Sequence, residues 1–166
     1  KEKVQKIILN RPIVEAGESL GYLPADFKRK VDPYFRPLYD AFHEMLGVEK
    51  TKQFIDKEII EIAPLAFIRG RNLNRSYIIL DESQNTTVGQ MKMFLTRMGS
   101  KSFMTITGDP SQIDLRKGEE SGLSDALTIL NEVEGIKITH LLDVDIVRNP
   151  IVKRIVEAYN EKEKKL

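Results

Sequence analysis

The sequence predicts an α/β domain in which a mainly parallel sheet lies between two layers of helices. Short apolar or β-branched runs that end abruptly in polar residues occur at residues 6–12, 77–84 and 103–112. Runs that are apolar throughout, without alternation, are typical of strands buried on both faces of a parallel sheet. Helical patterns lie between these runs, and alternating strands and helices indicate a three-layer αβα architecture.

The individual elements follow from periodicity, caps and prolines. Further strands are expected at residues 60–64 and 136–141. Apolar residues at helical spacing, capping residues and first-turn prolines mark the expected helices. These helices are residues 37–46 ending at Gly47, a helix after the capping box Thr87–Gln90, a helix through Leu123 and Val133, and a helix capped by Asn149.

Residues 12–37 contain four prolines and two glycines, so they are expected to form a long loop after the first strand. Long ordered loops at the carboxyl ends of parallel strands are often functional. An insertion without a role in function explains the same composition, and both readings stay open.

The length of 166 residues indicates one domain, predicted over residues 1–160 with a charged tail at 161–166. There is no cysteine, which excludes disulfides and thiol chemistry and agrees with a cytoplasmic setting. No apolar run reaches the roughly 18 to 20 residues of a membrane span. The net charge of +1 is not that of a protein that coats DNA, so any nucleic-acid contact must come from local basic clusters.

Acidic residues follow two of the predicted strands. Asp81 and Glu82 end one run, and Asp109 ends another 28 residues later, a spacing that fits one crossover helix. Neighbouring strands would bring these acids to one rim of the sheet, where ligands bind in parallel α/β folds. Carboxylates there suit Mg²⁺, and of two adjacent acids one can hold the metal while the other polarises water.

Polar residues near these acids extend the prediction. Gln84 and Gln112 are candidates to orient water or to contact a terminal phosphate, because an amide both donates and accepts hydrogen bonds. Gly108 would let the chain turn beside a ligand. Arg148 is either a phosphate-binding arginine or a surface partner of Asp143 or Asp145. The isolated histidines have no metal-ligand spacing.

Several segments resemble the PhoH-like family, phosphate starvation-inducible P-loop ATPases related to superfamily 1 helicases. The resemblance runs through most of the chain in order. It rests on IILNRPIVEAGESLGYLP, KVDPYFRPLYDAF, IIEIAPLAFIRGRNLN, YIILDESQNTT, QMKMFLTRMG, TGDPSQIDL, SGLSDAL and VRNPIVKRIVEAY. It implies a P-loop NTPase-like fold, ATP and Mg²⁺ as ligands, and a role in RNA metabolism.

The resemblance also implies roles for single residues. Asp81 would be the Walker B acid that holds Mg²⁺, Glu82 the catalytic base and Gln112 the sensor of the terminal phosphate. The resemblance implies nucleic-acid contacts for three arginines and phosphate contacts, in the same subunit or across a subunit boundary, for two others. The first three are Arg11, Arg69 and Arg71, and the other two are Arg97 and Arg148. For Arg11 the implied contact is with nucleic acid or with phosphate.

One part of the family pattern is absent. The Walker A motif GxxxxGK[ST], which cradles phosphates, does not occur in this sequence. In the related fold its strand lies centrally, beside the strand that carries GDPSQ, so we expect a gap in the middle of the sheet. We therefore expect the sequence to be a portion of a longer chain that is inactive by itself.

Three functions stay open from the sequence. The first is a magnesium-dependent ATPase acting with single-stranded RNA, for which the resemblance implies a homo-oligomeric ring such as a hexamer. The second is a ribonuclease, or the motor subunit of one with an RNA-processing partner. The third is a non-catalytic nucleotide switch that binds a protein partner, against which Glu82 and Gln112 argue.

Overall fold

The computed structural model describes residues 4–13, 24–145, 147 and 149–163. Within these residues the chain divides into two compact units, Lys1–Glu132 and Val133–Leu166. The elements in chain order are β1 (Lys6–Arg11), α1 (Pro24–Leu46), α2 (Val48–Asp56), β2 (Ile60–Pro64), η1 (Leu65–Ile68), β3 (Ser76–Leu80), η2 (Ser83–Asn85), α3 (Val88–Leu95), β4 (Phe103–Ile106), α4 (Gly122–Ile129), η3 (Asp143–Asp145) and α5 (Pro150–Glu163).

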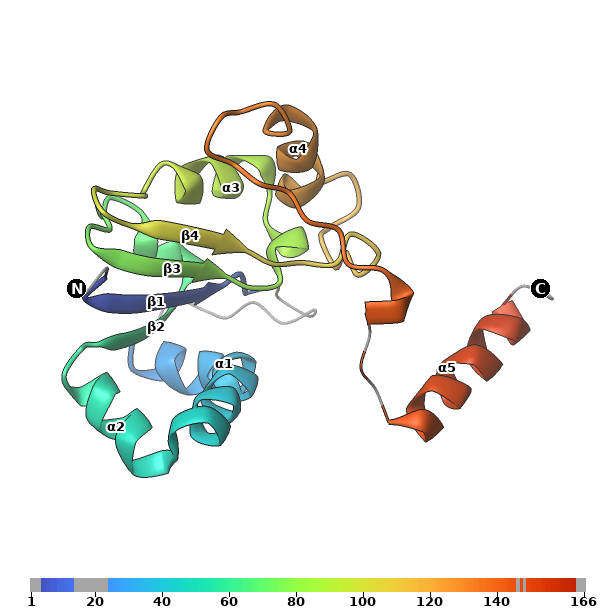
Figure 1. Ribbon diagram of the computed structural model, residues 1–166, viewed down its shortest axis with the longest axis horizontal. Coiled ribbons are helices and arrows are strands. Elements are labelled where there is room, and N and C mark those ends of the chain that lie inside the picture. Colours follow the sequence, from blue (N-terminus) through green and yellow to red (C-terminus); the bar gives the residue numbers. More distant parts are fainter. Residues whose placement is uncertain (1–3, 14–23, 146, 148, 164–166) are drawn as a thin grey trace. The chain divides into compact units, whose positions relative to one another are not determined.

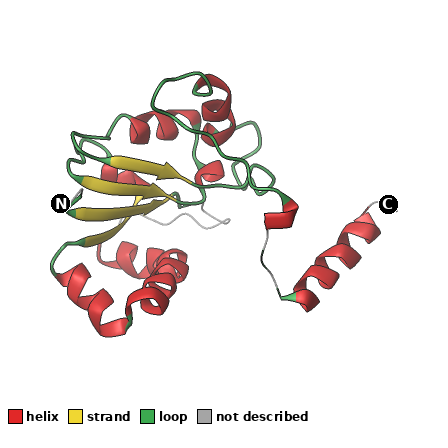
Figure 2. Ribbon diagram, in the orientation of Figure 1, coloured by secondary structure: helices red, strands yellow, loops and turns green. Residues whose placement is uncertain are grey.

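Four strands of the first unit form one sheet in the order β2-β1-β3-β4, with every pair parallel (Figure 2). The predicted α/β class and four of the five predicted strands are confirmed. The strand expected at residues 136–141 is wrong, because this stretch is irregular. Its apolar residues Ile136 and Leu141 are exposed, since no described strand pairs with them.

The gap expected in the middle of the sheet is wrong for the described strands. The described strands follow one another from β2 to β4 without a break, and β4 is the strand that precedes GDPSQ. On the outer side of β4, where the resemblance places the P-loop strand, the described residues contribute no strand.

Helices cover the two faces of this sheet and give the unit three layers (Figure 1). On one face, Ile8, Ile78 and Leu80 are almost completely buried in the cluster that includes Phe94 of α3 and Leu123 of α4. The opposite face has a second cluster built on Leu9, Ile60 and Phe42 of α1. Because successive strand residues point to opposite faces, an apolar run in a central strand can supply both clusters.

The helix nearest the first strand is longer than the sequence predicts. A loop was expected over residues 12–37, but α1 begins at Pro24, and Pro33 and Pro37 lie inside it. Prolines disfavour helix interiors because each removes a hydrogen bond, and the amphipathic pattern of α1 prevails over that local preference. The remainder of the expected loop, residues 14–23, lies outside the described part of the chain.

The connection after α1 also differs from the expectation. Gly47 ends α1 as predicted, with a positive φ of 81° that favours glycine. A second helix, α2, follows at once, and no sequence pattern predicted it. Thr51, fully buried, ties the two helices together through its hydroxyl, which donates to the carbonyl of Phe42 (3.1 Å) and to that of Gly47 (2.8 Å).

The helices on the other face follow the predicted signals more closely. Thr87 caps α3, and the predicted capping box is confirmed: its hydroxyl accepts from the Gln90 N–H while the Gln90 side chain accepts from the Thr87 N–H. The α4 helix ends at Ile129, before Val133, so it is shorter than expected.

The second unit contains η3 and α5. Asn149 caps α5 as predicted, because its side-chain oxygen accepts from the Ile151 N–H at 3.0 Å. Apolar residues on α5 are exposed within the described chain, including Ile151, Ile155 and Tyr159.

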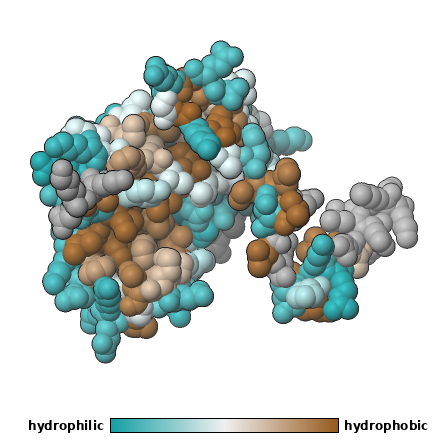
Figure 3. Space-filling view, viewed as in Figure 1, coloured by the Kyte–Doolittle hydropathy of each residue, from teal (hydrophilic) through white to brown (hydrophobic). Residues whose placement is uncertain are grey.

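Apolar residues gather on the face of the first unit seen in Figure 3, over the sheet and the neighbouring helices. The exposed aromatic residues Tyr77 of β3 and Phe103 of β4 stack with ring centroids 6.5 Å apart. None of the described helices has the length and apolar character that crossing a membrane requires.

Candidate functional site

The carboxyl ends of β1, β3 and β4 hold the acid pair in place through the backbone. After β3, the Asp81 N–H donates to the carbonyl of Asn10 (2.9 Å), and the Ser83 N–H donates to the carbonyl of Thr107 (3.0 Å). The ladder of the sheet therefore continues past the ends of the strands on both sides. It fixes the backbone that flanks Glu82, and it confirms that Asp81, Glu82 and the GDPSQ loop share one rim, as predicted.

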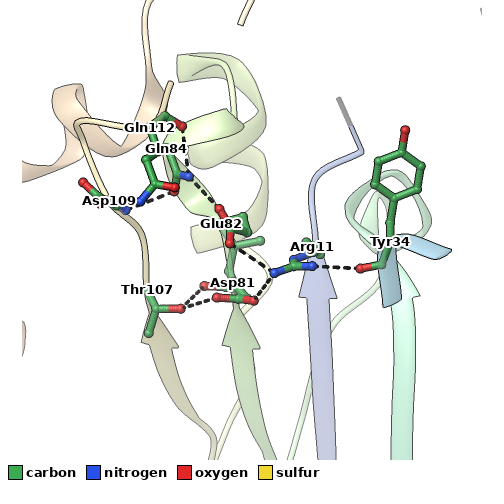
Figure 4. Close-up of polar contacts among 9 residues, drawn as sticks. Arg11, Tyr34, Asp81, Glu82, Gln84, Thr107, Asp109 and Gln112 are labelled. Atoms are coloured by element: carbon green, nitrogen blue, oxygen red, sulfur yellow. Dashed lines mark hydrogen bonds and ion pairs between the residues drawn. The ribbon is translucent and has the colours of Figure 1, made fainter. Parts of the chain in front are cut away.

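Arg11 bridges the two acids (Figure 4). Its Nη2 atom lies 3.0 Å from Asp81 Oδ2 and donates to Glu82 Oε1 at 3.1 Å, while Nη1 donates to the carbonyl of Tyr34 in α1 at 2.8 Å. Only 16% of the Arg11 side chain is exposed. The structure thus joins Arg11, predicted to contact nucleic acid or phosphate, to the acid pair.

Glu82 is held on its other side by Gln84. The amide nitrogen of Gln84 donates to Glu82 Oε2 at 2.7 Å, and its amide oxygen accepts from the Asp109 N–H at 3.1 Å (Figure 4). The Gln84 side chain is almost completely buried. Gln84 therefore connects the end of β3 to the loop after β4 and fixes the direction of the Glu82 carboxylate.

The backbone at Glu82 adopts the left-handed region, with φ 54° and ψ 37°. Residues other than glycine rarely adopt this conformation, and a strained residue that persists is often found at a functional site. Here it turns the chain from β3 into η2 immediately after Asp81 and presents the two adjacent carboxylates to the same arginine.

The GDPSQ loop is organised around Asp109. The Oδ1 atom of this residue accepts from the Ser111 N–H (2.9 Å) and hydroxyl (2.7 Å), and Oδ2 accepts from the Gln112 side-chain amide (2.5 Å). The Asp109 carboxylate thus shapes its own loop, and Gln112 lies on that loop near the acid pair. The backbone carbonyl of Gln112 also accepts from the Gln84 amide at 3.2 Å.

Gly108 is required by close packing. A Cβ at this position would lie 2.7 Å from both Ser83 Oγ and Leu123 Cδ2, and 2.8 Å from Gln84 Oε1. Such distances are well below van der Waals contact, so a larger residue would force these side chains to shift. Gly108 itself is exposed, and the turn expected beside a ligand stays a prediction.

The donor atoms at this rim fit Mg²⁺. Asp81 and Glu82 present hard oxygen ligands and are partly exposed, at 29% and 43% of their side chains. No group of three or more acidic, His or Cys side chains that could hold a metal exists in the described ranges. Two acids match a cation that keeps several waters and uses few protein ligands.

Two of the predicted arginines, Arg71 and Arg97, lie elsewhere in the unit. Arg71 pairs with Glu61 of β2 through a two-pronged contact, with Nη2 2.8 Å from Oε2. Arg97 donates to the carbonyl of Arg71 at 3.4 Å, and its own carbonyl accepts from the Leu73 N–H ahead of β3. Arg71 and Arg97 therefore lie at the amino ends of the strands.

Arg69 is exposed directly after η1. A hollow of about 410 Å³ lies on the Arg71 side of the sheet, and none of the acid-site residues lines it. Its polar lining is provided by Lys6, Tyr39, Glu58, Glu61 and Arg71. Arg148 lies outside the described residues.

The pKa shifts that can be assigned within the described chain belong to this second region. The hydrogen bond from Arg71 lowers the pKa of Glu61, while burial acts in the opposite direction. The same contact raises the pKa of Arg71. Burial raises the pKa of Tyr39, and the nearby Asp32 adds to the effect.

Two contributors to the site were missed from the sequence. The hydroxyl of Thr107 donates to Asp81 Oδ1 at 3.0 Å, and the carbonyl of Tyr34 accepts from Arg11. Thr107 could have been found, because β3 and β4 pair Leu80 with Ile106, which places the next residues side by side. Tyr34 gave no signal, since its contact is made by the backbone.

Comparison with known proteins shows which family this chain resembles. A family model described as "PhoH-like protein" matches residues 1–160. A "PhoH-like protein" of Bacillus subtilis (strain 168) is 59% identical over 158 residues, which are 95% of this chain and 50% of the relative.

Relatives with lower sequence identity have similar names and similar coverage. A "PhoH-like protein" of Mycobacterium tuberculosis (strain ATCC 25618 / H37Rv) is 52% identical over 158 residues, 95% of this chain and 45% of the relative. "Protein PhoH" of Escherichia coli (strain K12) is 44% identical over 159 residues, with coverages of 95% and 45%. The chain spans about half the length of the curated relatives it matches.

Proposed function

The chain belongs to the PhoH-like protein family, and on that premise we propose that it carries the acid half of a magnesium-dependent ATPase site. The observation that carries the proposal is the pair Asp81 and Glu82, held side by side where β3 ends next to β1 and β4. Two adjacent carboxylates with different partners can divide the tasks of binding a cation and accepting a proton.

The partners of each acid support separate roles. Asp81, joined to Thr107, is the ligand for Mg²⁺, largely through bound water. When bound, Mg²⁺ supplies positive charge that stabilises the phosphate oxygens. Glu82, fixed by Gln84, accepts the proton of the attacking water, and Gln112 lies on the adjacent loop for contact with the terminal phosphate.

The other half of the site is a phosphate-binding loop. This sequence has no GxxxxGK[ST] motif. We propose that the phosphates of ATP are held by a segment outside these 166 residues, on the outer side of β4. The family resemblance and the partial coverage of the relatives support this assignment.

RNA is the substrate or activator that we propose for the complete protein. The exposed Arg69 and the partly exposed Arg71 are the arginines best placed for contact with phosphates in nucleic acid. Since Arg97 lies at the rim opposite the acids, a phosphate contact by this residue would be made across a subunit boundary in a homo-oligomeric ring.

The decisive experiment measures ATP hydrolysis by the complete protein with and without single-stranded RNA. Glu82→Gln keeps the shape of the side chain and removes the base. We expect turnover to fall at least about a hundredfold while nucleotide binding is retained. Glu44→Gln, an exposed glutamate on α1, is the matched control and should leave turnover unchanged.

Each alternative function has its own outcome in this experiment. Unchanged hydrolysis in Glu82→Gln would contradict the mechanism. RNA degradation that persists without ATP would indicate a ribonuclease. Binding of ATP without hydrolysis in the wild type, under every condition, would indicate a nucleotide switch.

A further inference from the structure

Arg11 has contacts that a surface arginine or a nucleic-acid contact does not need. One guanidinium nitrogen serves both Asp81 and Glu82, and the other serves the carbonyl of Tyr34. Its Nε atom is buried and has no hydrogen-bond partner in the described structure. The side chain therefore lies inside the rim, between α1 and the acid pair, and not in solvent (Figure 4).

The position of the guanidinium matters for cation binding. Arg11 Nη2 is 3.0 Å from Asp81 Oδ2 and 3.1 Å from Glu82 Oε1, so it occupies the space between the two carboxylates. The other oxygen of Asp81, Oδ1, already accepts from Thr107. A divalent cation that approaches Asp81 thus meets a positive charge, and like charges at such separations repel each other.

We propose that Arg11 is a positioning residue that exchanges with a divalent cation at Asp81. Without the cation, Arg11 offsets part of the charge of the acid pair and reduces the repulsion between the adjacent carboxylates. When a cation engages Asp81, the guanidinium gives up that carboxylate and stays with Glu82 and the carbonyl of Tyr34. This extends the proposed function by naming the residue that couples metal binding to the placement of the base.

The contacts of Glu82 explain why the base stays in place during this exchange. Gln84 holds Oε2 at 2.7 Å and is itself fixed by the Asp109 N–H. Arg11 holds Oε1 and is anchored to α1. The carboxylate is thus fixed from two sides by elements that do not depend on Asp81.

The first test measures Mn²⁺ binding to the complete protein by electron paramagnetic resonance, without nucleotide. Arg11→Met removes the charge and keeps an unbranched apolar stem. We expect Mn²⁺ affinity to rise on the order of tenfold, because the competing charge is gone. Arg11→Lys keeps the charge, so its Mn²⁺ affinity should stay close to that of the wild type.

Two controls locate the effect. Arg36→Met removes an exposed arginine from α1 and should leave Mn²⁺ affinity unchanged. Adding Asp81→Asn to Arg11→Met should abolish the gain, because the exchange takes place at Asp81. Unchanged affinity in Arg11→Met, or no Mn²⁺ binding by either protein, would overturn the proposal.

The second test measures ATP turnover and rests on the proposed function. We expect both Arg11→Met and Arg11→Lys to lower kcat, since neither side chain can hold Glu82 and Tyr34 with the planar fork of arginine. Tighter Mn²⁺ binding with slower turnover is the expected signature in Arg11→Met. A merely structural role would weaken both properties together, and this result would contradict the proposal.

The two tests can reject the ATPase activity and the role of Arg11 independently of each other. Absence of hydrolysis in the wild type would reject the ATPase, while the Mn²⁺ comparison would still decide the role of Arg11. If Arg11→Met does not fold, the wild type can be titrated with Mg²⁺ while the guanidinium resonances of Arg11 are followed by nuclear magnetic resonance. Saturable shifts support the exchange, and constant Arg11 signals during Mg²⁺ binding at Asp81 refute it.

Discussion

The two rims of the sheet both contain arginine–carboxylate contacts, but the balance of charge differs between them. At the carboxyl ends of the strands, Arg11 faces two carboxylates, Asp81 and Glu82. At the amino ends, Arg71 faces one carboxylate, Glu61, and Arg97 adds a further positive charge. The first rim therefore keeps an excess of negative charge and the second an excess of positive charge.

This difference indicates which ligands each rim can accept. A balanced pair such as Arg71 and Glu61 satisfies its own charges and needs no ligand, whereas two acids that share one guanidinium can still bind a cation. The carboxyl-end rim is thus suited to a metal and the amino-end rim to an anion such as a phosphate. An arginine–carboxylate contact therefore leaves a different net charge at each rim, depending on how many carboxylates share the arginine.

The strongest test of this comparison removes one carboxylate from each rim. Asp81→Asn should lower Mg²⁺-dependent ATP turnover of the complete protein at least about a hundredfold, because the metal loses its ligand. Glu61→Gln changes an acid that is also paired with arginine and should leave turnover within about twofold. Steady-state hydrolysis at several Mg²⁺ concentrations measures both effects.

An equal loss of ATP turnover in Asp81→Asn and Glu61→Gln would contradict this difference between the rims. Such a result would mean that both carboxylates act through the stability of the unit and not through the metal. Thermal unfolding of each variant separates these cases, since Asp81→Asn should fold as the wild type does.

The sequence predicted the central part of the fold because its signals there are strong. Continuous apolar runs marked β1, β2, β3 and β4, and the capping box marked the beginning of α3. The failures lie where local preference and tertiary packing disagree. Prolines predicted a loop where α1 forms, and the apolar stretch 136–141 has no partner strand in the described structure.

The site was predictable only in part, for a related reason. The positions of Asp81, Glu82 and Asp109 follow from where strands end, which sequence can show. The hydrogen-bond partners of these acids depend on which strands are neighbours and on how far long side chains reach from them. Arg11 is 71 residues from Glu82 in the chain, so its contact with the acid pair could not be inferred from spacing.

A smaller loss of turnover is expected when Gln84, which holds the Glu82 carboxylate, loses its amide. Gln84→Leu replaces the buried amide by an apolar side chain of similar size, and leaves the Asp109 N–H and the Glu82 carboxylate without this partner. We expect turnover to fall about tenfold and the free energy of unfolding to fall by about 1–3 kcal/mol. Gln53→Leu on the exposed side of α2 is the control, and comparable loss in that variant would contradict the assignment.

Packing of the carboxyl-end rim can be tested without touching a charge. Gly108→Ala places a methyl group within 2.8 Å of Ser83, Leu123 and Gln84 side-chain atoms. We expect a loss of about 1–3 kcal/mol in the free energy of unfolding, because the loop and η2 must separate. Gly89→Ala in α3, where nothing lies within 4 Å, should instead stabilise by up to about 1 kcal/mol. Urea unfolding compares the two, and equal effects would show that Gly108 is not tightly packed.

The smallest effect concerns the amino-end rim and depends on pH. Because the Arg71 hydrogen bond lowers the pKa of Glu61 in the folded protein, the pair stabilises at pH values above the ordinary glutamate pKa of 4.5. That stabilisation is lost as the pH falls through the lowered folded-state pKa. Arg71→Met should therefore reduce the free energy of unfolding by less than about 1 kcal/mol at neutral pH, since both side chains are partly exposed.

The difference between wild type and Arg71→Met should stay constant from neutral pH to about pH 5 and shrink below the ordinary glutamate pKa. Glu58→Gln provides the control, because Glu58 is largely exposed and its partner Lys6 is partly exposed, and no change is expected. A difference that persists unchanged at pH 3 would show that Arg71 stabilises through packing of its stem. The amino-end rim would then hold an arginine whose charge is free for an anion, which would sharpen the contrast with Arg11.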